Sequence, residues 1–285
     1  MDRADLVGLV DRTLEAMMHR DPGRVPLATN ARYTENGQSL AVGKGLWATA
    51  TPGGLSRRAV LAEPNAGQAG WFGAIAENGN PIVLALRLKA AGERVSEIET
   101  VICRGHERIF NPGGMTLRTA FDALVPVAER ASRQSLLAAA NAYFDGIEQS
   151  NGTIIPSADD CARVENGVRT TLNAELGGKQ AYPLWGMPVA AQIDTGYYAY
   201  IEAIRDRRYP VIDEEHGLIM GVVAFDHPAT MKSVQVKGKG EIALPAFTQR
   251  PSTALIAELF QVRGGKITGI EAVLDFFPYG MKTGW

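Results

Sequence analysis

Two glutamates, Glu35 and Glu165, are each followed by Asn-Gly, and each closes a short segment with the composition of a strand. A carboxylate that is buried at a strand end has its pKa raised by desolvation, and it then suits a general base near neutral pH. The alternative interpretation is a hairpin turn, in which a solvated glutamate precedes an Asn-Gly corner. We treat both residues as candidate catalytic bases, with Glu165 the stronger of the two.

Histidine supplies a second kind of candidate. His227 follows Asp226 at the end of a continuous apolar segment, and an imidazole can act as acid or base near pH 7. Because adjacent residues of a strand point to opposite faces, we do not expect Asp226 to orient His227. His227 is therefore a candidate catalytic residue and Asp226 a candidate contact to the substrate. His216, in a predicted turn, is expected to be exposed, and His106 is a weaker candidate.

Two more glutamates, Glu99 and Glu271, recur in equivalent segments near the end of each half of the chain. Each shares a strand face with a valine, Val101 or Val273, and a carboxylate on an apolar face is costly unless it is paired. Such a residue can mark a cavity, and Glu271 is a candidate contact to the substrate. The alternative, which we favour, is a salt bridge to an arginine such as Arg87 across the sheet.

Aromatic residues gather in the second half of the chain. Trp185, Tyr197, Tyr198 and Tyr200 could line a pocket for an aromatic or polycyclic substrate. The alternative is that aromatics at helical spacing belong to the core, which we expect for at least one of them. We assign Trp185, Tyr197 and Tyr200 to substrate binding.

Several other kinds of site are not indicated. The sequence has no His or Cys cluster with metal-ligand spacing and no Gly-x-Ser-x-Gly elbow. The glycines at 67, 70 and 73 do not form a nucleotide loop, because no helix is predicted after them. Any catalysis is therefore expected to be free of cofactors, with a small molecule as the partner.

Composition narrows the protein class. A formal net charge of -2 without a long basic run argues against nucleic-acid binding. No apolar run approaches the length of a membrane span, and the N-terminus has no signal-peptide core. The two cysteines, Cys103 and Cys161, suit a reducing compartment. We expect a cytoplasmic protein that does not contact a membrane.

The elements that must position these residues occur twice. An amphipathic segment at 3–19 lies 130 residues before a similar one at 135–149, and the Glu-Asn-Gly phrase repeats at the same offset. The closing segments, 92–101 and 264–273, are 172 residues apart. Two copies of one domain are therefore predicted, at 1–104 and 134–285, with a connector and short helix at 105–133.

Each copy reads as a helix followed by strands with tight turns. Strands are predicted around 31–34, 58–62, 67–76, 81–88 and 95–103 in the first copy, and turns such as Asn36-Gly37 and Asn78-Gly79 separate them. The second copy adds a helix at 188–205, a hairpin at 207–225 and a closing hairpin at 256–276. This order favours an α+β fold with a curved antiparallel sheet wrapped on helices in each domain.

The second copy carries phrases that allow a resemblance to be stated. They are Ile204-Arg205-Asp206-Arg207-Arg208-Tyr209-Pro210-Val211-Ile212-Asp213-Glu214-Glu215, then Phe225-Asp226-His227-Pro228, then Pro278-Tyr279-Gly280-Met281 with Gly284-Trp285. With these phrases the chain resembles a widespread and largely uncharacterised family of tandem SnoaL-like proteins. Each copy is similar to the cone-shaped fold shared by SnoaL-like proteins, ketosteroid isomerase and nuclear transport factor 2. That fold hosts isomerases, dehydratases, lyases, cyclases and binding proteins, so the resemblance identifies no reaction.

The resemblance to ketosteroid isomerase implies a tyrosine on the first helix that donates to an oxyanion and a carboxylate base at the end of the first strand. These positions fall on Tyr143 and Glu165 in the second copy. In the first copy Thr13 replaces the tyrosine, although Glu35 keeps the carboxylate.

We therefore expect a cofactor-independent lyase or isomerase that abstracts a proton from a small apolar or aromatic molecule. Dehydration, a double-bond shift and retro-aldol cleavage all fit a base with a phenolic donor. The alternative is a non-catalytic small-molecule-binding or scaffold protein. We also expect the two sheets to pack against each other, the second domain to hold the larger and more polar cavity, and the whole chain to be capable of forming a homodimer.

Overall fold

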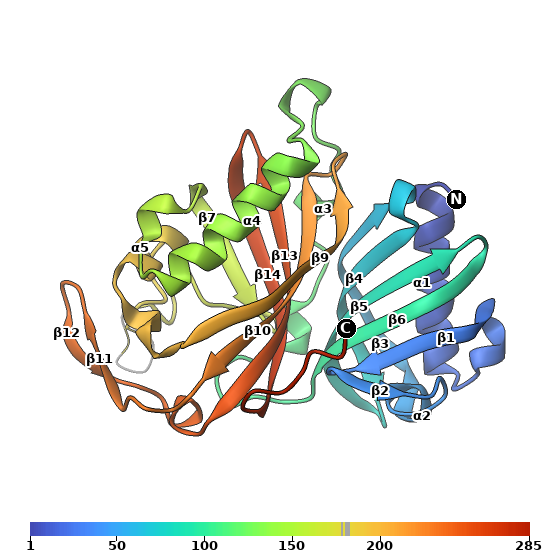
Figure 1. Ribbon diagram of the computed structural model, residues 1–285, viewed down its shortest axis with the longest axis horizontal. Helices are drawn as coiled ribbons and strands as arrows, with labels where there is room; N and C mark the ends of the chain where they lie inside the picture. The colour runs from blue at the N-terminus through green and yellow to red at the C-terminus, as the bar shows by residue number, and fades with distance from the viewer. Residues whose placement is uncertain (178, 180–182) are drawn as a thin grey trace.

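The computed structural model describes residues 1–177, 179 and 183–285, and it contains two domains with the same strand order. Each domain has a six-stranded sheet covered on one face by helices (Figure 1). The predicted α+β class with two tandem domains is confirmed. The predicted residue boundaries of the domains stay a prediction. None of the helices among the described residues is long and apolar enough to cross a membrane.

The first domain begins with a capped amphipathic helix and continues into its sheet. The Asp2 side chain accepts a hydrogen bond from the backbone of Asp5, which starts the helix. The elements are α1 (Arg3–Met18), β1 (Leu27–Glu35), β2 (Gln38–Leu40), α2 (Leu46–Thr49), β3 (Ala50–Glu63), β4 (Gln68–Glu77), β5 (Asn80–Ala91) and β6 (Arg94–Cys103).

The second domain repeats this order and adds a small hairpin between the fourth and fifth strands of its sheet in chain order. A connector with the four-residue helix α3 (Thr119–Asp122) precedes it. The elements are α4 (Arg133–Glu148), β7 (Ser157–Glu165), β8 (Val168–Arg169), α5 (Val189–Asp194), β9 (Ala203–Asp213), β10 (Leu218–His227), β11 (Ser233–Val236), β12 (Gly240–Ala243), β13 (Ser252–Arg263) and β14 (Lys266–Pro278).

One strand pair in each sheet differs from the antiparallel prediction. The strand orders are β2-β1-β6-β5-β4-β3 and β8-β7-β14-β13-β10-β9, and in each sheet the first long strand pairs in parallel with the last one. The other pairs are antiparallel because tight turns connect most of them. The first long strand of each sheet, β1 or β7, pairs with its short hairpin strand on one side. Its other side is taken by the last strand of the meander, β6 or β14, which runs in the same direction.

Two predicted helices, the one at 188–205 and the connector helix expected over 116–131, are shorter than expected. The segment 188–205 forms only α5, a 3-10 turn at Tyr197–Tyr200 and the start of β9. Gly196 has a positive φ of 78° and separates α5 from the 3-10 turn. The segment 116–131 holds only α3 and a 3-10 turn at Val127–Glu129. Pro126 lies between these two turns and cannot continue a helix.

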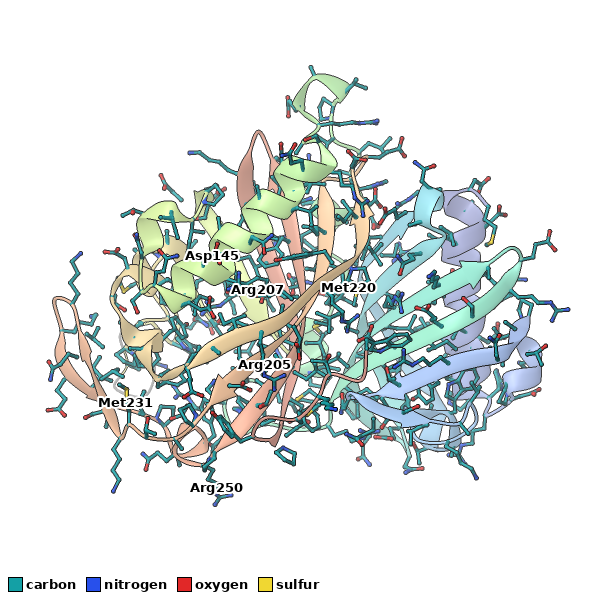
Figure 2. All side chains as sticks on the ribbon, viewed as in Figure 1. Asp145, Arg205, Arg207, Met220, Met231 and Arg250 are labelled. Carbon is teal, nitrogen blue, oxygen red and sulfur yellow. The ribbon has the colours of Figure 1, made fainter. Side chains whose placement is uncertain are left out.

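The two sheets pack face to face, which confirms the predicted contact between the copies. Helices α1 and α4 lie on the outer faces, and the inner faces share one apolar cluster (Figure 1). Met220 of β10 belongs to this cluster and is labelled at the face that the second sheet turns toward the first domain (Figure 2). The cluster also holds Phe72, Val101, Leu259 and Val273, from both domains. Each sheet thus has both of its faces buried.

Charged pairs surround this apolar interface in a nearly symmetric arrangement. Arg58 of β3 binds Glu271 of β14 at 2.5 Å, and the equivalent Arg208 of β9 binds Glu99 of β6 at 2.6 Å. Pairing of Glu99 or Glu271 with Arg87, expected from the sequence, is wrong, since Arg87 contacts Glu97 and Gln68. Each glutamate does form a salt bridge to an arginine, as the favoured alternative expected, but the arginine belongs to the other domain.

A second symmetric set lies at the helix ends. Arg3 at the start of α1 binds Asp213 of the second domain, and Arg133 at the start of α4 binds Glu63 of the first. The same two carboxylates accept backbone N–H groups across the interface, from Ala62 to Asp213 at 3.1 Å and from Ile212 to Glu63 at 2.8 Å. The interface is therefore self-complementary, as in an isologous dimer.

The repeated Glu-Asn-Gly phrase is a hairpin corner in both domains. Asn36 and Asn166 have positive φ angles of 48° and 46°, as a turn of this kind requires. Each asparagine amide also exchanges two hydrogen bonds with one backbone residue of the parallel strand, Ile102 or Leu274. The asparagine thus joins the hairpin to the meander.

The C-terminal tail returns to the first domain (Figure 1). The indole nitrogen of Trp285 donates to Thr34 Oγ1 at 2.8 Å, and the Arg32 guanidinium lies 3.9 Å from the centre of the indole ring. A cation over an indole face is attracted by its quadrupole. The tail is therefore a further contact between the domains.

Candidate functional site

A cavity of about 110 Å³ lies in the second domain, between its sheet, the 3-10 turn at Tyr197–Tyr200 and the start of the connector. Five of the residues predicted for the site line it: Glu165, Trp185, Tyr197, Tyr200 and His227. A cavity on the order of 150 Å³ holds benzene, and this space is somewhat smaller. The space therefore suits a compact ligand with no more than one ring.

Strand ends and one turn bring these residues together. Glu165 is the last residue of β7, directly before the Asn166-Gly167 corner, and His227 is the last residue of β10, in which every residue is buried. The 3-10 turn presents three tyrosines to the cavity, and Tyr200 stacks on His227 with ring centres 5.6 Å apart. Glu165 and His227 therefore both lie at strand ends, as expected from the sequence, and both line the cavity.

A buried arginine, Arg163, lies next to Glu165 and was not among the predicted site residues. The Arg163 guanidinium donates to Tyr198 Oη at 2.6 Å, to Thr170 Oγ1 at 3.1 Å and to the Gln192 side chain. Its Nε lies 3.7 Å from Glu165 Oε1. Only 2% of Arg163 is exposed, so this cation depends on its neighbours for both charge and hydrogen bonds.

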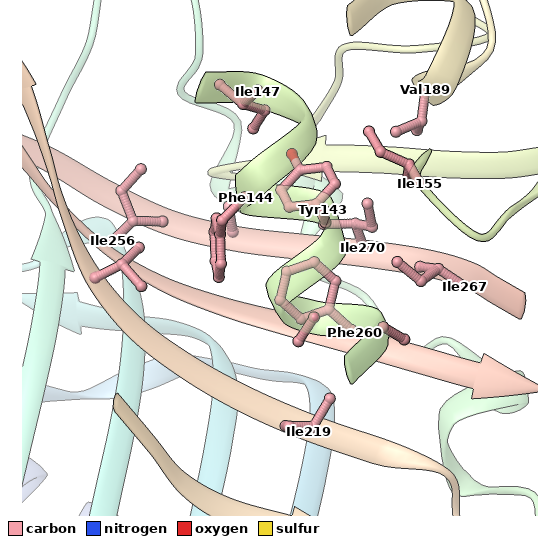
Figure 3. Close-up of a cluster of buried hydrophobic side chains, with 14 of the residues drawn as sticks. Tyr143, Phe144, Ile147, Ile155, Val189, Ile219, Ile256, Phe260, Ile267 and Ile270 are labelled. Carbon is pink, nitrogen blue, oxygen red and sulfur yellow. The ribbon is translucent and has the colours of Figure 1, made fainter. Parts of the chain in front are cut away.

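Tyr143 belongs to the same buried network. It projects from α4 onto the sheet beside Phe144 and Phe260 (Figure 3), and its hydroxyl accepts from Arg163 at 3.3 Å. It also hydrogen-bonds the Glu258 carboxyl group. Tyr143 is not among the described side chains that line the cavity, which differs from the position that the ketosteroid isomerase resemblance implied.

Glu258 is the most perturbed acid of the network. It lies in β13, 2% exposed, and burial raises its pKa to about 8, with a further rise from the charge of Glu165. The nearby Arg163 cation and the bond to Tyr143 oppose this rise only in part. Glu258 is therefore a neutral acid in the folded protein at neutral pH, and it leaves Arg163 and Glu165 as the charged pair of the network.

Two histidines with neutral rings face the cavity. His106 Nδ1 accepts the backbone N–H groups of Arg108 and Ile109, both at 3.1 Å, so its neutral ring carries the proton on Nε2. Burial lowers the pKa of His106, although the charges of Glu107 and Glu165 act against this. Burial also lowers the pKa of His227, to about 4. Both rings are therefore uncharged near pH 7.

Arg108 and Trp185 form another part of the lining. The guanidinium of Arg108 lies 5.7 Å from the centre of the Trp185 ring, and it hydrogen-bonds the Tyr197 hydroxyl. Arg108 and His106 come from the connector and not from a strand of the second domain. The connector therefore supplies part of the site.

Three of the predicted site residues lie elsewhere. Glu35 is in the first domain, where its carboxylate accepts from Tyr33 Oη, the backbone of Leu46 and Arg104. Asp226 binds Arg205 at 2.6 Å and points away from the cavity lining, on the opposite face from His227. Glu271 lies in the interface between the sheets. Asp226 and Glu271 therefore do not line this cavity.

His216 also differs from its expectation. It is 5% exposed, because its ring nitrogen Nδ1 contacts Asp213 Oδ1 at 2.9 Å. The turn was identified correctly, but its histidine is buried against Asp213 at the end of β9.

The first domain lacks the polar network. Thr13, Tyr33 and Leu86 occupy the places of Tyr143, Arg163 and Glu258, and the core there is filled by side chains such as Trp47 and Trp71. A groove of about 390 Å³ lies at one end of α1, and it is lined mainly by exposed residues such as Arg12 and Glu93. The prediction that the second domain holds the larger and more polar cavity is therefore wrong, because this groove is larger and most of its lining residues are charged. The aromatic cavity with the buried network is nevertheless in the second domain.

The described residues include no group of three or more His, Cys, Asp or Glu side chains that could hold a metal ion.

Comparisons with known proteins give one family and 24 matching chains among solved structures. A family model described as "Domain of unknown function (DUF8021)" matches residues 129–274. No curated protein sequence matches the chain. Among solved structures, one from Silicibacter sp. TM1040, assigned provisionally as a polyketide cyclase, has 15% identity, a TM-score of 0.32, and coverage of 50% of this chain and 90% of that one. One from Rhodopseudomonas palustris, assigned provisionally as an isomerase, has 16% identity, a TM-score of 0.29, and coverage of 51% and 92%.

Proposed function

The chain belongs to the family described as a domain of unknown function, DUF8021, and we propose that its second domain is a cofactor-independent lyase or isomerase. The proposed reaction begins with removal of a proton from a carbon next to a carbonyl group of a small apolar or aromatic molecule. The observation that carries the proposal is the position of Glu165, the only carboxylate among the described side chains that line the cavity.

Glu165 has the features of a general base. It ends a strand, its side chain is 24% exposed, and the Arg163 guanidinium 3.7 Å away fixes it from behind. A base must reach the proton that it removes while its own rotamer is held. Arg163 supplies this support, and Tyr198, Gln192 and Tyr143 hold Arg163 in turn.

His106 is the proposed donor to the developing oxyanion. Its Nε2–H is buried without a hydrogen-bond partner among the described residues, and a neutral imidazole can polarise a carbonyl oxygen. Tyr143 then has a different role from the one that the resemblance implied. In this proposal it is a positioning residue that acts through Arg163.

The steps balance without a cofactor. Glu165 takes the proton from carbon, and the electron pair of that C–H bond moves toward the carbonyl, which becomes an enolate bound to His106. In an isomerisation, the protonated Glu165 returns the proton to another carbon. In an elimination, the enolate collapses and expels a leaving group such as hydroxide, which takes up the proton. The aromatic lining keeps the apolar part of the ligand out of water.

The test follows deuterium exchange from D₂O into the carbon next to the carbonyl of cyclohexanone and acetophenone, by proton NMR. Wild-type protein is expected to catalyse exchange of at least one ketone. Glu165→Gln should lower the rate by roughly 10²–10⁴-fold, and Tyr143→Phe should lower it less. The matched control is Glu35→Gln, the equivalent residue of the first domain, which should leave the rate unchanged.

Exchange at the wild-type rate in Glu165→Gln would remove Glu165 from the mechanism. Ketones that bind but do not exchange in the wild-type protein would instead support the alternative, a non-catalytic small-molecule-binding protein.

A further inference from the structure

Two imidazole nitrogens in the cavity have no hydrogen-bond partner among the described residues: Nε2 of His106 and Nδ1 of His227. Both atoms are buried, and both rings line the same cavity. A buried polar atom without a partner costs free energy that a bound ligand can recover. His227 is 4% exposed as a whole residue, so bulk water does not replace the missing partner.

The two rings flank one aromatic side chain. The centre of the Phe276 ring lies 5.5 Å from that of His106 and 5.6 Å from that of His227. Phe247 packs on His106 at 5.0 Å, and Tyr200 stacks on His227 at 5.6 Å. The two polar atoms are therefore set within an aromatic wall, which suits a flat ring that stacks or packs edge-on.

The chemistry of each nitrogen limits what it can bind. His106 Nδ1 already accepts two backbone N–H groups, so Nε2 carries the proton and needs an acceptor oxygen. The ring of His227 is neutral and hydrogen-bonds the backbone of Phe225, while its Nδ1 has no partner among the described residues and can pair with either a carbonyl or a hydroxyl group. Neither ring offers a positive charge near pH 7, so an uncharged oxygen is the matching group.

We propose that the cavity selects single-ring molecules that carry two oxygen substituents, one bound to His106 Nε2 and the other to His227 Nδ1. This proposal rests on the proposed function, because it places the substrate in the same cavity. The oxygen at His106 is the one that becomes the oxyanion, and the oxygen at His227 fixes the orientation of the ring. His227 is thus a specificity-determining residue and not the base.

Binding of phenol, resorcinol and hydroquinone tests this inference, since they share one ring and differ in their oxygens. Calorimetry on the wild-type protein should show at least one of the two diols binding about threefold to tenfold more tightly than phenol, the range expected for one added neutral hydrogen bond. His227→Phe keeps a ring and removes the nitrogens. It should bring the affinity for that diol down to that for phenol. His106→Phe should weaken binding of all three.

Imidazole ¹⁵N NMR gives a readout that does not depend on the variants. The chain has four histidines, and only the His106 and His227 signals should shift when the preferred diol binds. His19 is exposed and His216 is bound to Asp213, so their signals serve as internal controls, and His19→Phe is the matched control variant.

Equal affinity for phenol and both diols would overturn the inference, as would a diol preference that survives His227→Phe. Diol binding with the expected preference but without ketone exchange would leave the inference standing and overturn the proposed catalysis. Exchange without any diol preference would overturn the inference and leave the proposed catalysis standing.

Discussion

Arg208 of the second domain binds Glu99 of the first through two hydrogen bonds, 2.6 and 3.3 Å long, across the interface between the sheets. The Glu99 side chain is 3% exposed, and Arg208 is its only ionic partner among the described residues. The equivalent Glu271 differs, since Arg118 lies 3.6 Å away in addition to Arg58. The interface is thus nearly symmetric in its residues but not in how well each carboxylate is compensated.

Removing Arg208 should therefore destabilise the protein strongly. Arg208→Met leaves the Glu99 carboxylate buried without its cation, and such a change costs about 3–5 kcal/mol of unfolding free energy. Arg58→Met should cost less, because Arg118 still faces Glu271. Denaturant titration of each variant measures the cost.

Two further variants complete this test. The double variant Arg208→Met/Glu99→Leu should regain most of the lost stability, because an apolar pair needs no compensation. Lys237→Met is the control for an exposed ion pair, since Lys237 is 76% exposed, and it should change stability by less than about 1 kcal/mol. A cost for Arg208→Met as small as that of Lys237→Met would show that the interface pair does not contribute to stability.

Most of the fold could be predicted because its signals are local. Corners such as Asn36-Gly37 and Asn78-Gly79 and the amphipathic pattern of α1 depend on neighbouring residues, and the strands between them follow. The parallel pairing of β1 with β6 depends on how distant segments meet, which no local pattern encodes. The interface pairs were missed for the same reason, since Arg58 and Glu271 are 213 residues apart.

The repeated asparagine should matter equally in the two domains, although only one holds the candidate site. Asn166→Ala loses both hydrogen bonds to Leu274 and replaces asparagine, which tolerates a positive φ, with alanine, which tolerates it less well, so it should cost about 2–4 kcal/mol. Asn36→Ala should cost a similar amount. The matched glycine variants lose the same hydrogen bonds but tolerate the backbone angle, and they should be about 1 kcal/mol less destabilising than alanine. Thermal unfolding of the four proteins measures this order, and alanine variants as stable as wild type would show that the corner needs no asparagine.

The candidate site was predictable only in part. Glu165 and His227 could be selected because strand ends are where a sheet presents side chains to a cavity. Arg163 had a signal that was not used, since it shares a strand face with Glu165, two residues away. Glu258 also had a sequence signal, because it is a lone carboxylate inside the continuous apolar segment of β13. His106 was named only as a weaker candidate and Arg108 was not selected, because a connector has no periodicity to show which side chains turn inward.

Glu258 should make the stability of the protein fall as the pH rises. An unfolded glutamate ionises near pH 4.5, whereas burial keeps Glu258 protonated in the folded protein up to about pH 8. Between these values the unfolded state binds fewer protons than the folded state, so the contribution is fully present below pH 4.5 and is lost as the pH rises to about 8. Glu258→Gln stays neutral at every pH and keeps a partner for Tyr143. The variant should match wild type near pH 4.5 and be more stable by about 3 kcal/mol at pH 7.

Denaturant titrations of wild type and Glu258→Gln across this pH range measure the difference in stability, in which the contributions of the histidines cancel. Glu93→Gln, at an exposed position, is the control and should show a flat difference. A Glu258→Gln difference that is equally flat, or that reverses sign, would mean that Glu258 is ionised in the folded protein.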